Sequence, residues 1–151
     1  MDMELEFLMR IFCAALLGGL IGLEREYRAK EAGFRTHFLV AMGSALFMIV
    51  SAYGFSDIQM NDATSRWDVS RIAAQVVSGI GFIGAGTIIF RKQENMVSGL
   101  TTAAGLWVVA AIGLACGVGM YVLATACTFL VLAGLEAFNF FLRKLDKHRK
   151  E

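Results

Sequence analysis

Five apolar stretches divide the chain, and short polar connections separate them. A helix needs about 20 residues to cross a hydrocarbon core of about 30 Å, and most of the stretches approach that length. The last two meet at the tight connection Cys116–Gly119, which predicts an antiparallel helical hairpin. The pattern therefore predicts an all-α membrane protein with one domain, residues 1–151, and five transmembrane helices. The predicted spans cover about 5–23, 38–55, 72–90, 100–115 and 120–142.

Composition agrees with this class and excludes others. Hydrophobic residues make up 57% of the chain and the mean hydropathy is +0.61, more than a soluble domain of this length needs. The net charge of +1 gives no reason to expect nucleic acid, so the lipid bilayer is the expected partner. The three cysteines show no CxxC pairing and lie in or beside the spans, so neither a disulfide framework nor a metal–thiolate site is expected.

Lysine and arginine predict the orientation, because segments rich in them stay in the cytoplasm. Eleven of the 14 basic residues fall in 24–36, directly after Phe90, or in the tail after Leu142. The other side of the membrane holds only Arg10, Arg66 and Arg71, diluted by aspartate and glutamate. The expected topology places the N-terminus outside and the C-terminus in the cytoplasm.

Glycines inside the spans predict where helices approach closely. The chain has no proline, and association in lipid depends on packing of small residues rather than on exclusion of water. The third stretch is the richest in glycine, so we expect it to be the packing centre and the chain to form a homo-oligomer. The predicted packing positions are Gly18, Gly22, Gly79, Gly81, Gly84 and Trp107, the last against the third helix.

Polar residues at the predicted cytoplasmic edge form the first candidate cluster. Glu24 ends the first span, where the helix dipole disfavours an anion, and Arg35 across the loop is the expected partner. Thr36 suits the N-cap of the second helix, and Thr101 and Thr102 open the fourth. A charged loop and ordinary helix caps would explain the same residues. The predicted cluster is Glu24, Arg25, Arg35, Thr36, Asn95, Thr101 and Thr102.

A second candidate cluster lies on the predicted outer face, at the start of the third helix. Asp68 and Arg71 are three residues apart, and Gln75 follows on the same side. A cap and a surface pair would explain the first two. An amide carried into the membrane needs partners on other helices.

Four stretches resemble the MgtC/SapB family of bacterial inner-membrane proteins. They are GGLIGLERE at 18–26, AGFRTH at 32–37, RIAAQVVSGIGFIGAG at 71–86 and GLTTAAGLW at 99–107. They cover the first through the fourth span in family order. The resemblance implies a multi-pass bacterial plasma-membrane protein, and family members are linked to growth under magnesium limitation, survival in macrophages and restraint of the ATP synthase.

Long members of that family carry a cytoplasmic domain resembling ACT folds, and they have other residues at the positions of Thr101 and Val108. This chain is most similar to the short form, so we expect no such domain. Whether the virulence and synthase roles apply stays open.

Three function classes follow. The expected one is a non-enzymatic protein with a regulatory or stress-adaptation role in magnesium limitation, ion or ATP homeostasis, acting through another membrane complex. The alternative is a cation transporter or channel, for Mg²⁺ or coupled to protons, although carboxylates at mid-depth are missing from the third and fourth spans. An enzyme is the least expected class, since no catalytic constellation appears and both histidines lie at the cytoplasmic edge. No cofactor is expected.

Overall fold

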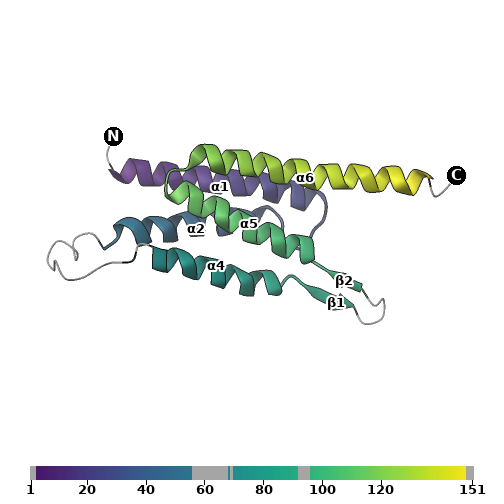
Figure 1. The fold of residues 1–151 in the computed structure, drawn as a ribbon, viewed down its shortest axis with the longest axis horizontal. Coiled ribbons are helices and arrows are strands. Elements are labelled where there is room, and N and C mark those ends of the chain that lie inside the picture. Colours follow the sequence, from purple (N-terminus) through teal and green to yellow (C-terminus); the bar gives the residue numbers. More distant parts are fainter. Residues whose placement is uncertain (1–2, 56–67, 69, 92–95, 149–151) are drawn as a thin grey trace.

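The computed structural model describes residues 3–55, 68, 70–91 and 96–148, with side chains in 3–55, 68, 70–88 and 97–137. Figure 1 shows helices lying side by side in an elongated bundle, with a small hairpin at one end. The elements are α1 (Met3–Tyr27), α2 (Phe34–Tyr53), α4 (Ser70–Ala85), β1 (Ile89–Arg91), β2 (Met96–Ser98), α5 (Leu100–Gly117) and α6 (Tyr121–His148).

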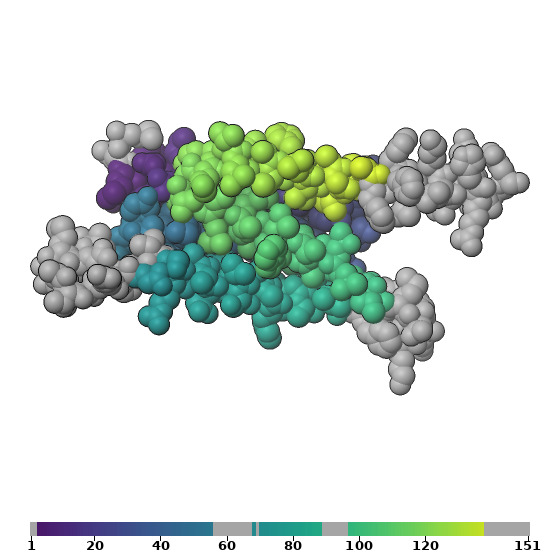
Figure 2. All heavy atoms as spheres, in the orientation of Figure 1, coloured from purple at the N-terminus to yellow at the C-terminus, as the bar shows by residue number. Residues whose placement is uncertain are grey.

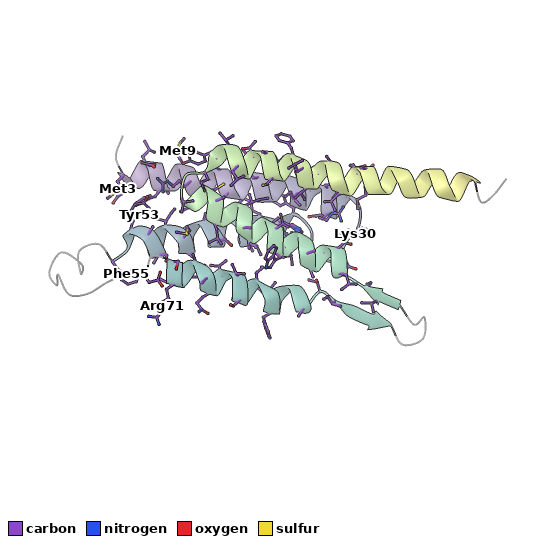
Figure 3. All side chains as sticks on the ribbon, viewed as in Figure 1. Met3, Met9, Lys30, Tyr53, Phe55 and Arg71 are labelled. Atoms are coloured by element: carbon purple, nitrogen blue, oxygen red, sulfur yellow. The ribbon has the colours of Figure 1, made fainter. Side chains whose placement is uncertain are left out.

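The bundle has two ends that differ in the elements they hold. The Tyr53 end contains the start of α1, the end of α2 and the start of α4 (Figures 1 and 3). The Lys30 end contains the end of α1, the start of α2, the β1–β2 hairpin and the start of α5 (Figures 1 and 3). These names are used below for the two ends.

The core lies between α1, α2 and α5, with α6 packed against α1 and α5. Its side chains are small or branched and almost fully buried, as expected where helix backbones come close. The core residues are Ala14, Leu17, Ile21, Ala41, Ala45, Val109, Ile112, Cys116 and Ala124.

Ala41 of α2 marks the closest approach of three helices. A Cβ atom added to Gly18 of α1 would overlap the Cβ of Ala41, and one added to Gly113 of α5 would overlap the Ala41 carbonyl oxygen. Gly22 is equally tight, because its added Cβ would lie 2.7 Å from the Cα of Phe34. The predicted packing role of Gly18 and Gly22 agrees with these distances.

The prediction that the third helix is the packing centre is wrong within the single chain. Helix α4 packs against α5 and α2 at the edge of the bundle, and Figure 2 shows it (teal) along one long side of the molecule. A Cβ at Gly79 or Gly81 would meet nothing within 4 Å, and one at Gly84 would make an ordinary contact with Ala103 at 3.5 Å. The centre is α5 instead, whose Gly113 lies against α2.

Trp107 is 53% exposed, while Leu106 and Ala110 are buried in a cluster with Ile80 of α4. Ala103, four residues before Trp107, lies against Gly84 of α4, and Ala110 follows three residues after it, so Trp107 lies on the face of α5 that meets α4. Its predicted contact with the third helix stays a prediction.

Three helices of the described part, α1, α2 and α5, are long and apolar enough to cross a membrane. The third predicted span ends earlier than expected, because α4 stops at Ala85 and the chain turns into β1. The Thr87 hydroxyl donates a hydrogen bond to the Gly84 carbonyl oxygen at 2.7 Å, which closes the turn. The β-branched run that follows favours a strand, and β1 pairs with β2 in antiparallel register, with Phe90 opposite Val97.

We predict that Gly113→Ala destabilises the protein by about 1–3 kcal/mol, because the new methyl group overlaps the α2 backbone. Gly81→Ala is the matched control, since its methyl group enters open space within the chain. Thermal unfolding of the two purified variants in detergent is the measurement. Equal melting temperatures for both variants would contradict the assignment of α5 as the packing centre.

Candidate functional site

The Lys30 end holds a buried cluster of charges around Glu24. Arg25 is 3% exposed, and its Nε donates to Glu24 Oε2. The Nε of Arg28 lies 3.6 Å from the other carboxylate oxygen of Glu24. Two cations therefore share one carboxylate at the end of α1, which compensates an anion at the unfavourable end of the helix dipole.

Arg28 connects this cluster to α6. Its Nη2 donates to Glu136 Oε1, and this hydrogen bond raises the pKa of the Arg28 guanidinium. Glu136 is half exposed, so the pair is screened by solvent and is a weak tie between α1 and α6.

The predicted partnership of Glu24 with Arg35 is wrong. Arg35 is exposed and makes no ion pair with Glu24, because the two arginines of the Glu24 helix end already hold that carboxylate. Thr36 is not the N-cap, since α2 begins at Phe34. The backbone N–H of Phe34 instead donates to Glu26 Oε2 at 2.8 Å, so a carboxylate of α1 caps α2.

The start of α5 completes the cluster. The Thr102 side chain is buried, and its hydroxyl donates to Glu31 Oε2 at 2.6 Å. Gly99 precedes the helix with φ +86°, and in the described part of the chain no side chain caps this helix start. Thr101 and Thr102 line the same cavity as Arg25, while Asn95 lies outside the described residues.

These elements enclose a cavity of about 720 Å³ at the Lys30 end. The end of α1, the following loop, β2, the start of α5 and α6 contribute to its wall. Charged and hydroxyl side chains line one part and apolar groups the remainder. The polar lining side chains are Arg25, Lys30, Glu31, Ser98, Thr101 and Thr102.

His37 is a site residue that the sequence reasoning missed. Its side chain is fully buried, and Nδ1 lies 2.9 Å from the Gly33 carbonyl oxygen. A carbonyl only accepts, so Nδ1 carries the proton, and the bare Nε2 has no partner among the described residues. The signal was its place inside the AGFRTH stretch, between a polar loop and an apolar span.

Arg10 at the Tyr53 end was also missed. Its Nη1 donates to the Gly117 carbonyl oxygen at 2.9 Å and to the Tyr53 hydroxyl at 3.1 Å, and Nη2 pairs with Glu6. One guanidinium thus joins α1, the end of α2 and the end of α5, where the helix dipole favours a cation. Placing an arginine inside an apolar stretch costs free energy unless it has partners. The position of this arginine in the first stretch therefore indicated that it must have partners.

The structure does not bring the residues of the predicted outer cluster together. Asp68 Oδ1 accepts from the Ser70 hydroxyl at 2.6 Å and from the Ser70 N–H at 2.9 Å, and these bonds lower the pKa of Asp68. This is a cap at the start of α4. Arg71 and Gln75 are exposed, and Figure 3 shows Arg71 pointing away from the bundle.

In the described part of the chain, no three His, Cys, Asp or Glu side chains gather in a way that could hold a metal ion. The polar groups there are helix caps, buried ion pairs and a lined cavity. Their chemistry is electrostatic and hydrogen-bonding.

We predict that Arg25→Gln destabilises the protein by about 3 kcal/mol, because it removes one of the two cations that hold a largely buried carboxylate. Arg35→Gln removes the same charge from an exposed position near the same end and should melt as the wild type does. Thermal unfolding in detergent compares the two. If Arg35→Gln were the more harmful change, the reassigned partner of Glu24 would have to be rejected.

Residues 11–144 match the model for the MgtC family. YhiD of Escherichia coli K12, named as a proposed magnesium transporter, is 54% identical over 137 residues, or 91% of this chain and 62% of YhiD. MgtC of Salmonella typhimurium LT2 is 46% identical over 126 residues, or 83% of this chain and 49% of MgtC. MgtC of Brucella abortus is 48% identical over 120 residues, or 80% of this chain and 46% of that protein. This chain thus spans about three fifths of YhiD and about half of each MgtC, and no solved structure matches it.

Proposed function

The chain belongs to the MgtC family, and from this membership we propose that it is a multi-pass protein of the bacterial inner membrane with a non-enzymatic role in adaptation to magnesium limitation. We propose further that it acts by contacting another membrane protein. The observation that carries this proposal is a stripe of polar side chains on the outward face of α4.

The stripe consists of Arg71, Gln75 and Ser78, at spacings that place them on one face of a helix. All three side chains are exposed, and Gln75 and Ser78 make no hydrogen bond with the described residues. Phe82, which is 85% exposed, continues the same face. Lipid tails cannot form hydrogen bonds with an amide or a hydroxyl, whereas the polar groups of a neighbouring helix can. Gln75 and Gly79 also border a cavity of about 480 Å³ between α4 and α2. The exposed polar face of α4 together with this cavity therefore suits a transmembrane helix of a partner protein.

The alternative function is cation transport, which the name of YhiD favours. Four of the described carboxylates at the two ends of the bundle support the regulatory role instead, because each of these four has a partner. Glu6 is paired with Arg10 and Glu24 with two arginines, so an entering cation would have to displace a guanidinium. Glu26 caps α2, and Glu31 accepts from Thr102.

The proposed topology has five spans, with α4 and α6 crossing beside α1, α2 and α5. Helix α4 has 16 residues and covers about 24 Å, somewhat less than the hydrocarbon thickness. Local thinning of the bilayer accommodates such a mismatch at modest cost. The Lys30 end faces the cytoplasm in this arrangement, because most basic residues gather there.

We predict that reporter fusions place residue 30 and the C-terminal tail in the cytoplasm and residue 62, outside the described residues, on the external side. The reason is the distribution of lysine and arginine. Alkaline phosphatase and fluorescent-protein fusions report the two sides. A cytoplasmic signal at residue 62 would overturn both the orientation and the outer position of Asp68.

We predict that proteoliposomes containing the purified protein show no saturable Mg²⁺ flux, because Glu6 at one end of the bundle and Glu24 at the other are already paired with arginines. A dye trapped inside the vesicles measures entry, and a known magnesium channel is the positive control. Selective, saturable flux would establish the transporter alternative.

The partner interface has its own test. Gln75→Leu should melt as the wild type does, since the amide has no hydrogen-bond partner among the described residues, yet lose growth rescue under magnesium limitation and co-purification of a crosslinked partner. Val122→Leu on the exposed face of α6 is the control and should keep both. Self-crosslinking alone would identify the partner as a second copy, and full rescue by Gln75→Leu would refute the α4 interface.

A further inference from the structure

The unexplained feature of the Lys30 end is the guanidinium of Arg25. The side chain is nine-tenths buried and lines the cavity of about 720 Å³. Only its Nε is engaged, with Glu24, while Nη1 and Nη2 make no hydrogen bond with the described residues. Neither nitrogen is a fully buried atom without a partner, unlike the Nε of Arg10 or of Arg28. The Arg25 guanidinium is therefore held in place by Glu24, while its Nη1 and Nη2 are available to donate hydrogen bonds to a ligand.

The start of α5 presents further donors to the same cavity. The first N–H groups of a helix have no acceptor within it, and no side chain of the described residues caps this helix. Leu100, Thr101 and Thr102, which carry those groups, all line the cavity. Gly99 fixes this exposed start, because φ is +86° and an added Cβ would overlap the Thr87 carbonyl oxygen. Helix starts of this kind favour anions through their dipole.

The charges of the side chains that line the cavity indicate whether its ligand is an anion or a cation. Arg25 and Lys30 contribute two positive charges, the helix start adds a partial one, and Glu31 contributes one negative charge. The Glu31 carboxylate already accepts from Thr102. A divalent cation would meet a buried guanidinium, whereas an anion would meet donors on two sides.

We propose that this cavity binds a phosphoryl group, held by the two free nitrogens of Arg25 on one side and by the start of α5 and Thr101 on the other. A guanidinium fork matches two oxygens of a phosphate, and bare N–H groups match a third. In the proposed topology the cavity lies at the cytoplasmic headgroup level, which both a free phosphate and an anionic phospholipid can reach. The site stands independently of the partner-binding role, because it rests on other residues and another element.

The test measures binding by the full chain with two probes. Inorganic phosphate, titrated against chloride at constant ionic strength, should raise the melting temperature of the protein in detergent if free phosphate is the ligand. Phosphatidylglycerol, compared with phosphatidylcholine in nanodiscs by native mass spectrometry, should be retained if the ligand is a lipid headgroup. Either result supports the site and identifies the source, and binding of neither probe overturns it.

Variants then locate the binding. Lys30→Gln should weaken the affinity of whichever probe binds by about tenfold, and Thr101→Val by about threefold, and neither removes a buried ion pair. Arg25→Gln should abolish binding where it folds. Arg35→Gln is the matched control, because it removes one positive charge at the same end but does not line the cavity. Equal weakening by Arg35→Gln and Lys30→Gln would show a diffuse surface effect and refute the site.

Glu31→Gln tests the sign of the ligand. The glutamine oxygen can still accept from Thr102, while the only negative charge of the described lining is gone. An anion should then bind about threefold more tightly or better. Weaker binding of the phosphate probe by Glu31→Gln, or a gain of thermal stability from Mg²⁺ that this variant loses, would overturn the proposal.

Discussion

The arrangement of this bundle depends on close contacts at Ala41, whose methyl group lies against Gly18 and whose carbonyl oxygen lies against Gly113. A Cβ atom at either glycine would overlap Ala41, so the two glycines allow α1 and α5 to lie directly against α2. In lipid, where association depends on packing, such contacts hold helices together without a large apolar interface. The consequence reaches the Lys30 end, because the end of α1 and the starts of α2 and α5 must converge there. That convergence brings Arg25, buried His37 and Thr102 into one neighbourhood.

The two buried arginines, Arg10 and Arg25, differ in their position relative to α5 and in their number of partners. Arg10 lies at the end of α5, where the dipole attracts it, and donates to a backbone carbonyl, a phenol and a carboxylate. Arg25 lies near the start of the same helix, where the dipole repels a cation, and has one partner. Glu24 offsets part of that repulsion. A bound anion between Arg25 and the helix start would offset the remainder, which distinguishes a ligand-holding arginine from a structural one.

Sequence pattern predicted the helices and the approach at Gly18 and Gly22, because hydrophobic length and small residues are local properties. It failed where the outcome depends on which face meets which neighbour. The abundance of glycine assigned Gly79 and Gly81 to the core, yet a Cβ at either position would meet nothing within 4 Å, whereas Gly113 in the fourth stretch went unnoticed. Thr36 was the natural cap by residue type, but a carboxylate eight residues before the helix start takes that place. Such contacts between segments become visible only in three dimensions.

The four stretches that resemble the family divide into two groups in space. Three of them, 18–26, 32–37 and 99–107, meet at the Lys30 end, and the fourth, 71–86, is α4 and the turn after it. These groups are joined through α5, whose Leu106 and Ala110 pack against Ile80 of α4 while its first turn lines the cavity. A ligand that shifts the start of α5 would therefore act on the position of α4 through packed side chains rather than through a loop. A helix that carries an outward polar stripe at the edge of the bundle is well placed to pass such a shift to a neighbouring protein.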